Sequence, residues 1–449
     1  FDAVRSLFLT VLIMALLPSA FITPFIGVLV WSWVSFMSPH RLVWGIGDSL
    51  PWALIVGSVG IAGWLVSERR RIPMDATTVL LALLAVLFTI STYYSLVPDL
   101  AWVKWQAIMK EFVFFFITAA LVTNRVRVHA LMWIMVISIS YYGIKGGIFT
   151  LITGGSYRVY GPDLSEISDN NQLAAALVMV LPLMNYLGRQ SKSEVLRLGS
   201  RFSMGFCLLS ILASYSRGAF IALAAMVLWL WRHTRHKLIS VVVIGGTLAA
   251  AVTFMPSDWV ARMSSIQDYQ QDASAEGRLQ IWETAIKIAV ARPLTGGGFY
   301  APYTQSVVDQ YSPGVQARAV HSIWLEVLGE NGFPALFVWT ALLLIGLTNC
   351  RFIIRRTKDI PELRWANDLG HMSIVALLGY AVGGSFLSLP YWDFYYTLLV
   401  LIACVRRITA QELALMGKTE PTFADRLKLA RVKPTLPVPQ PQMAMRPTK

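Results

Sequence analysis

The sequence has few of the residues with which a soluble protein meets water. Charged residues make up 14% of its 449 positions, whereas 56% are hydrophobic. This composition excludes an ordinary soluble domain and favours a polytopic membrane protein. Strand-like alternation of polar and apolar residues is absent too, which argues against a transmembrane barrel.

Cysteine and the common catalytic motifs are also scarce. No Cys-x-x-Cys pair occurs, so the sequence predicts neither a disulfide framework outside the membrane nor a cysteine metal site; the three cysteines are Cys207, Cys350 and Cys404. There is no HExxH, Walker or GxSxG motif. The carboxylates of the expected outer loops are scattered and include no Asp-x-Asp pair. We therefore expect no metal and no cofactor.

The charge that is present has an excess of one sign. Lysine and arginine number 38 against 25 acidic residues, which gives a net charge of +13. The basic residues crowd into one set of loops, as the positive-inside rule requires, and this argues for a lipid bilayer and against nucleic acid as the partner. The loops assigned to the cytoplasm on this ground are residues 67–71, 125–127, 189–201, 232–237 and 351–358.

Hydrophobic runs of about 17 to 25 residues recur along most of the chain, each long enough to cross a hydrocarbon core as a helix. The expected fold class is an all-α polytopic membrane protein with 12 or 13 transmembrane helices. The two counts differ in whether Pro18 to Pro24 is a turn between two spans or a break within one. We interpret the first run, Leu7 to Leu17, as a retained anchor.

The pattern divides the chain into four regions. Residues 1–255 are expected to form transmembrane helices with short loops, and residues 256–321 a mainly helical periplasmic loop that carries the catalytic residues. Residues 322–405 are expected to form the C-terminal transmembrane helices. Residues 406–449 read as a basic cytoplasmic tail with a disordered, proline-rich end.

The stretch from Pro256 to Gly332 is the long segment that is too polar for a bilayer, although hydrophobic segments flank it. A helix is predicted from Glu276 to Ala291, and the glycines Gly296 to Gly298 are interpreted as a hinge after it. We call this stretch the platform. Arginines and a histidine on a membrane-seated platform indicate chemistry on a lipid-linked anion.

A sorting rule that removes basic residues from outer loops makes each remaining one informative. Arg217 lies between a serine and a glycine where a helix begins, so its guanidinium and nearby backbone N–H groups are expected to face one anion. The alternative is that Arg217 extends to the lipid headgroups or caps a neighbouring helix.

Arg278 precedes Trp282 by four residues, which places both on one face of the predicted helix. The pair is a candidate substrate-binding surface or, alternatively, a structural stack. Arg158 and its neighbour Tyr157 are candidates to bind a phosphate or a sugar ring, unless Arg158 pairs with Asp163. Arg318 is a further candidate, although a long loop also carries solvated charge.

His321 lies at the outer mouth of a predicted span. A neutral imidazole accepts a proton at neutral pH, so His321 is the candidate general base. Glu326 and Glu330 follow on the next helix and strengthen that assignment. The alternative is a helix-mouth histidine packed under the platform.

Together these motifs resemble the O-antigen ligase and polymerase superfamily, close to the O-antigen ligases and to the branch known as exosortase-associated O-glycosylation ligases. The resemblance rests first on three short motifs that occur in the same order as in that superfamily: Ser216–Ala219, Arg278 and Trp282 with Pro293–Gly298, and His321–Gly332. It rests also on two motifs in the N-terminal half, Met37–Arg41 and Tyr142–Gly147.

The resemblance implies a GT-C-like helical fold in the bacterial inner membrane. It also implies metal-independent transfer of a glycan from undecaprenyl pyrophosphate to an acceptor hydroxyl at the periplasmic face. By motif, Arg217 and Arg278 correspond to residues that bind the donor, and His321 to the catalytic base. The expected acceptor is lipid A-core oligosaccharide; a protein side chain or a growing glycan is the alternative. Direct displacement predicts inversion at the anomeric carbon.

A lipid-linked glycan transporter is the alternative from another class. A transporter is expected to place charged residues at the bilayer midplane. Here the predicted spans are nearly free of charge apart from Lys145 and a few residues near their ends. That distribution favours an enzyme.

Overall fold

The computed structural model describes residues 2–66, 71–233, 237, 245–246, 253–264 and 273–417. Within these ranges every regular element is a helix, which confirms the all-α expectation. Six described helices are long and apolar enough to cross a membrane. The count of 12 or 13 spans and the GT-C-like arrangement remain predictions, and the span expected between residues 238 and 255 lies largely outside the described residues.

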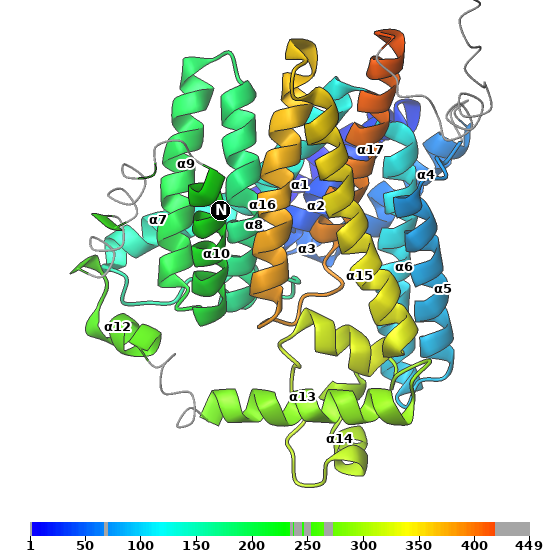
Figure 1. The fold of residues 1–449 in the computed structure, drawn as a ribbon, viewed down its shortest axis with the longest axis vertical. Coiled ribbons are helices and arrows are strands. Elements are labelled where there is room, and N and C mark those ends of the chain that lie inside the picture. Colours follow the sequence, from blue (N-terminus) through cyan, green and yellow to red (C-terminus); the bar gives the residue numbers. More distant parts are fainter. Residues whose placement is uncertain are drawn as a thin grey trace, which may run out of the picture.

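Most described helices stand side by side and form an upright bundle (Figure 1). Within the run from α5 to α10 and within the run from α15 to α17, successive members run in opposite directions, whereas α10 and α15 run in the same direction. The bundle contains α5 (Ala76–Tyr93), α6 (Pro98–Leu121), α7 (Arg125–Thr153), α8 (Asn170–Gln190), α9 (Glu194–Ala213), α10 (Arg217–His233), α15 (Ile323–Thr357), α16 (Arg364–Gly384) and α17 (Asp393–Leu415).

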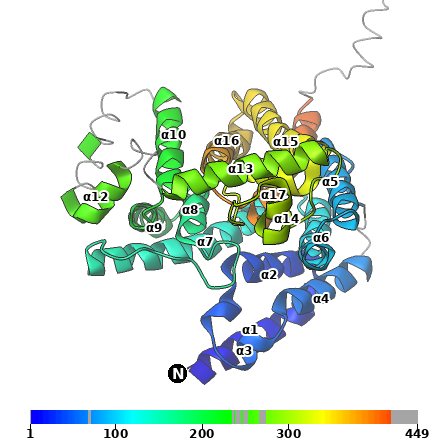
Figure 2. The same cartoon turned by 90° about the horizontal axis from the view of Figure 1, so that it is seen from below.

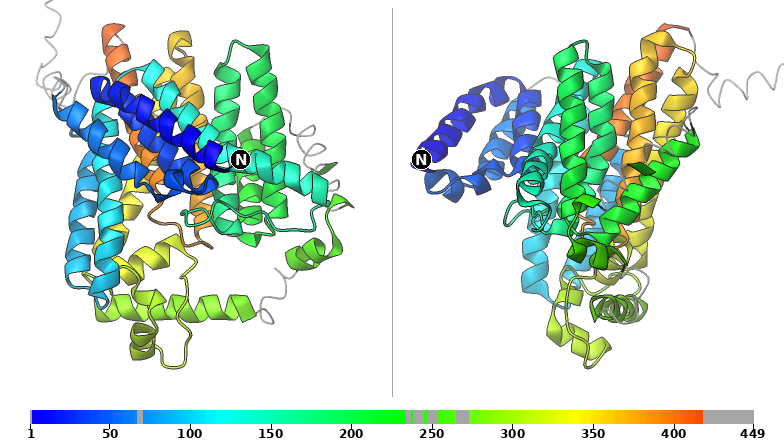
Figure 3. Two further views of the ribbon diagram at one scale, coloured as in Figure 1. Left: turned by 180° about the vertical axis from the view of Figure 1, so that it is seen from behind. Right: turned by 90° about the vertical axis from the view of Figure 1, so that its left-hand side faces the viewer.

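The N-terminal helices form a separate group beside this bundle (Figure 3). They are α1 (Asp2–Ile22), α2 (Pro24–Met37), α3 (Ile46–Ser49) and α4 (Trp52–Val66). Helix α1 continues through Pro18, and Pro24 begins α2, where a proline costs no helical hydrogen bond. Of the two expectations for Pro18 to Pro24, the turn between two helices is the one observed.

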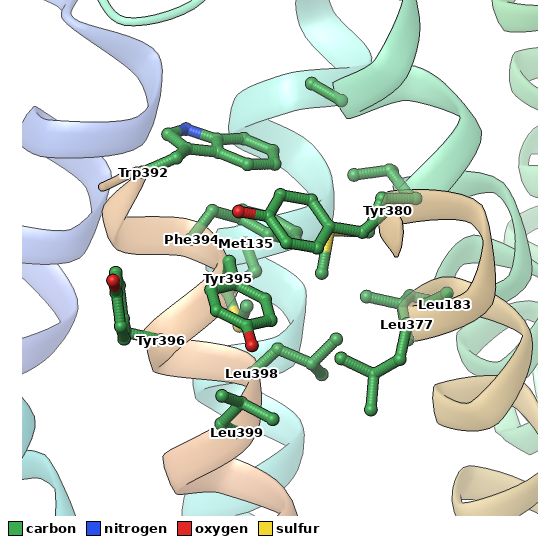
Figure 4. Packing of buried hydrophobic residues seen from close by; sticks show 14 of the residues in the cluster. Met135, Leu183, Leu377, Tyr380, Trp392, Phe394, Tyr395, Tyr396, Leu398 and Leu399 are labelled. Carbon is green, nitrogen blue, oxygen red and sulfur yellow. The ribbon is translucent and has the colours of Figure 1, made fainter. Parts of the chain in front are cut away.

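The centre of the bundle is aromatic. Tyr380 of α16 stacks on Tyr395 of α17 with ring centroids 4.3 Å apart, and Tyr395 in turn contacts Tyr396 edge-on. Figure 4 shows these rings among leucines and Met135 from neighbouring helices. The buried hydroxyl of Tyr395 has no hydrogen-bond partner among the described residues, whereas that of Tyr380 donates to the carbonyl oxygen of Leu389 at 2.8 Å. The loop before α17 is thereby fixed to the core.

The platform covers one end of the bundle, which we call the platform end. Helix α13 (Ala273–Ala291) lies across the ends of the upright helices (Figures 1 and 2). It ends at Ala291, as predicted. A short helix, α12 (Ser257–Ser264), precedes it, and η3 (Ala301–Tyr303) and α14 (Gln305–Tyr311) follow it.

The hinge interpretation of Gly296 to Gly298 is wrong. The N–H of Gly298 donates to the carbonyl oxygen of Glu330 at 2.7 Å, and a Cβ at Gly298 would lie 2.0 Å from the Ser95 hydroxyl oxygen. The segment is packed against α15 and the α5–α6 turn, so glycine is needed there for close approach and for the positive φ of Gly298. It joins the platform rigidly to the bundle.

The opposite end of the bundle carries the basic loops. Arg407 of α17 binds Asp75, which caps α5, with an N–O distance of 2.9 Å. Arg406 donates to the side-chain oxygen of Asn349 at 3.0 Å. Helix α17 therefore runs past the expected boundary at residue 405 to Leu415, and the start of the predicted tail is helical and packed. Residues 418–449 lie outside the described residues.

Candidate functional site: the histidine loop under the platform

His321 lies in the short segment between α14 and α15, where the platform meets the bundle. Its φ of 53° is left-handed, which costs a non-glycine residue about 1–2 kcal/mol. Such strain persists only where surrounding contacts enforce it, and it concentrates at functional sites.

Two contacts hold the peptide unit that joins Val320 to His321. The indole N–H of Trp282 donates to the carbonyl oxygen of Val320 at 2.7 Å. The backbone N–H of His321 donates to the Ser388 hydroxyl oxygen at 2.8 Å. One partner comes from α13 and the other from the α16–α17 loop, so this peptide is clamped between platform and bundle.

Trp282 therefore takes a role that the sequence did not predict. It does lie one turn beyond Arg278 on α13, but its polar atom contacts backbone of this chain. This bond makes Trp282 a positioning residue for His321. Trp282 also remains a candidate to contact a sugar of the substrate.

Two of the predicted arginines act directly on His321. Burial lowers the pKa of His321 to about 4, and the charges of Arg278 and then Arg318 act in the same direction, while Asp169 opposes them. The imidazole is consequently neutral at pH 7 and available to accept a proton. An anion bound between these arginines would cancel their effect and raise the pKa.

Arg318 contacts α13 at Gly277, the residue before Arg278. A Cβ at Gly277 would lie only 1.9 Å from an Nη atom of Arg318, so the guanidinium rests on the bare backbone of α13. Arg318 also donates to the side-chain oxygen of Gln316 at 3.2 Å. The missing side chain of Gly277 thus leaves space on α13 for the guanidinium of Arg318, next to Arg278 in the sequence.

Arg217 is the first residue of α10, as predicted. The turn before it is fixed to α8, because the Asn170 amide donates to the carbonyl oxygen of Ser214 at 2.5 Å. A Cβ at Gly218 would lie 3.1 Å from Cβ of Phe386, so α10 meets the α16–α17 loop at this level. That loop also contains Ser388, the partner of His321.

The N-terminal turn of α8 links the two arginine regions. Gln172 donates to the carbonyl oxygen of Ser388 at 3.0 Å, and Asp169 lies close enough to act on His321. Since Asn170 holds the turn before Arg217, one helix end positions both Arg217 and the His321 loop. The predicted catalytic set of His321, Arg217 and Arg278 is accordingly attached to one connected frame.

Arg158 and Tyr157 lie on the loop between α7 and α8, on the far side of this helix end. The guanidinium carbon of Arg158 is 5.8 Å from the ring centre of Tyr215, which precedes Arg217 by two residues. Among the described residues no ion pair joins Arg158 to Asp163, so the structural alternative for Arg158 is not observed. Tyr157 packs its ring against Phe149 with centroids 6.2 Å apart.

Glu326 and Glu330 are buried on the first turns of α15. The hydroxyl of Tyr303 donates to Glu326 at 2.7 Å, and Glu330 accepts from the hydroxyl of Tyr391 at 2.6 Å and the backbone N–H of Tyr300 at 2.8 Å. Burial and the neighbouring Glu326 raise the pKa of Tyr303 well above its usual range. The two carboxylates fasten η3 and the loop before α17 to the first turns of α15.

Sequence reasoning missed Ser388, Asp169 and Gln172. The separation of Ser388 from His321 along the chain gives no local signal. Asp169 precedes Gln172 by three residues, and an Asp followed three residues later by Gln is a recognisable helix start. That signal, which α8 confirms with a capping box, was available.

Among the described residues no group of three or more His, Cys, Asp or Glu side chains has a geometry that would hold a metal ion. The positive charges that act on His321 are those of Arg278 and Arg318.

A multi-pass helical membrane protein with arginines around a strained histidine is the class that fold and site define. Residues 202–340 match the family model described as O-antigen ligase, a range that contains Arg217, Arg278, Arg318 and His321. Residues 4–192 match a family of unknown function. No curated protein matches the chain significantly.

The match supports the O-antigen ligase superfamily and, at a coarse level, a ligase- or polymerase-type glycosyltransferase. Such a family implies a lipid-linked glycan and an acceptor as partners in a membrane. The segment with Arg158 and Tyr157 falls in the other match.

Proposed function

We propose that this protein transfers a glycan from undecaprenyl pyrophosphate to an acceptor hydroxyl at the periplasmic face of the bacterial inner membrane, as an O-antigen ligase does. The observation that carries the proposal is the placement of a neutral, strained histidine beside Arg278 and Arg318, with Arg217 on the same frame. The family match over these residues supports it.

In the proposed step, the acceptor oxygen attacks the anomeric carbon of the donor sugar. The bond from that carbon to the pyrophosphate oxygen breaks, and His321 takes the proton of the acceptor hydroxyl. A positioned base of this kind contributes about 10²–10⁴-fold to the rate. Attack opposite to the leaving group inverts the anomeric configuration.

Pyrophosphate is a good leaving group once its charge is spread. Arg278 and Arg217 are proposed to bind it through charge-assisted hydrogen bonds, with Arg318 beside them; the planar guanidinium matches two phosphate oxygens at once. Fixed positive charge aimed at the developing negative charge lowers the barrier without a metal.

Lipid A-core oligosaccharide is the acceptor we favour. A protein side chain or a growing glycan would make the protein an O-oligosaccharyltransferase or a polymerase of the same superfamily. Transport of the lipid-linked glycan is the alternative of another class, and Lys145, on a membrane-spanning helix, is the residue that favours it.

Reconstitution of the purified full chain tests the proposal. The chain is incubated in EDTA with undecaprenyl-pyrophosphate-linked glycan and, in parallel, with lipid A-core, an acceptor protein or free glycan, and products are analysed by mass spectrometry. We expect a product of joined glycan and acceptor in one arm and its loss in His321→Ala. Movement of intact donor across vesicles with no joined product in any arm would favour transport instead.

A further inference from the structure

Two motifs from the N-terminal half of the chain, which contribute no residue to the proposed catalytic site, contact each other. One is the segment Met37–Arg41 after α2, and the other is the segment Tyr142–Gly147 on α7. The hydroxyl of Tyr142 donates to the carbonyl oxygen of Met37, which ties the two segments together. The loop that carries Arg158 closes over both.

These three segments line an open cavity of about 280 Å³. Its volume lies just below the usual range for small-molecule pockets, so it suits one small polar unit and not a long oligosaccharide. Its charged lining residues are Arg41, Lys145, Arg158 and Asp163, and its aromatic ones are Tyr142, Phe149 and Tyr160.

Glycines shape the wall of this cavity. A Cβ at Gly146 would lie 2.5 Å from a methyl carbon of Val159, and a Cβ at Gly161 would lie 1.8 Å from the carbonyl oxygen of Ile167. The loop can therefore lie flat on α7 only because these two positions lack side chains. This close packing brings Arg158 and Lys145 to one cavity from separate elements.

The cavity carries three cationic groups and one carboxylate. Arg41 contacts Asp48 outside the cavity lining, with an N–O distance of 3.3 Å, and Arg158 stands over the Tyr215 ring. Within the described part of the chain, the side chain of Lys145 forms no hydrogen bond or ion pair. Lys145 is exposed about two turns before the end of α7, and a lysine on a membrane-spanning helix is costly unless it reaches water or a charged partner.

We propose that this cavity binds a phosphorylated monosaccharide unit, and that it is the acceptor subsite of the proposed glycosyl transfer. Three cations match a phosphate dianion. The two tyrosines and Asp163 supply a ring-stacking surface and an acceptor for sugar hydroxyl groups. The role as an acceptor subsite rests on the proposed function, whereas the binding of a sugar phosphate does not.

The position of the cavity fits that role. The Tyr215 ring lies under Arg158, its hydroxyl donates to the carbonyl oxygen of Gly155 at 2.8 Å, and Arg217 follows two residues later. A sugar phosphate held by Arg41, Lys145 and Arg158 thus lies next to the donor frame but is not part of it. The donor pyrophosphate and the acceptor phosphate would each have their own arginines.

Binding is tested on the purified full chain with glucose 6-phosphate, glucose and inorganic phosphate as probes, by calorimetric titration. We expect the sugar phosphate to bind more tightly than either comparison ligand. Lys145→Met is expected to weaken it at least tenfold, and Lys145→Arg to restore most of the affinity. Lys110→Met on α6 is the matched control, because Lys110 is exposed and lines a different cavity.

Arg158→Gln repeats the test from an exposed loop, in case Lys145→Met does not fold. Equal affinity of Lys145→Met, Arg158→Gln and wild type for the sugar phosphate would overturn the proposal. Binding of inorganic phosphate as tight as that of glucose 6-phosphate would overturn the saccharide assignment and leave a simple anion site.

Kinetics then separate the subsite from the function. Lys145→Met is expected to raise KM for a phosphorylated acceptor about tenfold, with KM for the donor and kcat unchanged, whereas His321→Ala loses kcat and keeps sugar phosphate binding. A rise in donor KM instead would overturn the acceptor role. If no transfer occurs in wild type, the proposed function fails, while the titration still decides whether the cavity binds the ligand.

Discussion

The two ends of the helix bundle use arginine in different ways. At the end opposite the platform, Arg407 pairs with Asp75 and Arg125 donates to Gln190 while standing over Trp365. These groups connect helices. At the platform end, Arg278 and Arg318 converge on the charge environment of His321, and Arg318 rests on a glycine.

The difference is one of balance. At the opposite end, the arginines are paired with a helix-capping carboxylate, amide oxygens and an aromatic ring, so their charge stabilises the fold. At the platform end, positive charge is concentrated beside a buried imidazole and lowers the pKa of His321, which is an arrangement that an anionic ligand would relieve. Clustered like charge that shifts the pKa of a neighbouring group is typical of a functional site.

The largest expected effect concerns the sides of the membrane. We expect the platform to face the periplasm and the opposite end the cytoplasm, because basic loops stay inside. Single cysteines at Ser306 and Lys358, both exposed, should react with an impermeant maleimide from opposite sides. The three native cysteines are buried and give little background. Labelling of both positions in intact spheroplasts would show that the two ends of the bundle do not face opposite sides of the membrane.

His321→Ala should lower kcat by about 10²–10⁴-fold while donor-lipid binding is kept. The reason is that the imidazole takes a proton but does not carry the pyrophosphate charge. The measurement is glycan transfer alongside donor binding on the same purified protein. Near-normal transfer at equal abundance would reduce His321 to a packed residue at a helix mouth.

The pH profile of the wild type gives a further signature of the same base. A free-enzyme pKa of about 4 for His321 leaves the base active down to that pH, so kcat/KM should fall on the acid side only near pH 4. The acid limb of kcat should lie higher, because bound pyrophosphate offsets the arginines. In His321→Ala both limbs should disappear.

Arg278→Lys should lower kcat/KM by about 10–100-fold, since a point charge replaces a planar fork. Arg125→Lys at the opposite end is the matched control and should leave transfer unchanged with only a small loss of stability. Donor titrations and turnover on both variants check this. Equal losses in the two would mean that arginine acts structurally at both ends.

Much of this architecture could be predicted from the sequence, because hydrophobic length and the sorting of basic residues are local signals. The start of α10 at Arg217 and the end of α13 at Ala291 follow from such signals. The clamp on His321 could not be predicted. It depends on Ser388 and on the indole of Trp282, which only the packing of distant helices brings together.

The glycines show a second limit. The segment from Gly296 to Gly298 has the composition of a hinge, yet two of its backbone N–H groups donate hydrogen bonds to the carbonyl oxygens of Gly329 and Glu330. Glycine permits both flexibility and close packing, and sequence alone does not separate the two. The kink at Gly332, with a φ of 77°, lets α15 bend around this joint.

Trp282→Phe should cost about 2–10-fold in kcat, because a single neutral hydrogen bond contributes about 0.5–1.5 kcal/mol and here holds the His321 peptide. Donor binding should change less than kcat. Trp324→Phe is the control, since its indole N–H donates to Ser385 and not to the histidine loop. A loss confined to KM would instead assign Trp282 to the substrate.

The smallest expected effect, Gly277→Ala, sharpens the comparison most directly because it moves a charge without removing it. The new methyl group would lie 1.9 Å from an Nη atom of Arg318, so that guanidinium must leave its place at Gly277. Donor KM should rise a few-fold, while α13 gains up to about 1 kcal/mol from alanine in a helix. Gly205→Ala on α9 has no atom within 4 Å and should leave KM unaltered. Stability and affinity should thus change in opposite directions at Gly277, as measured by thermal unfolding and donor titration. An unchanged donor KM would show that Arg318 does not contribute to the donor site.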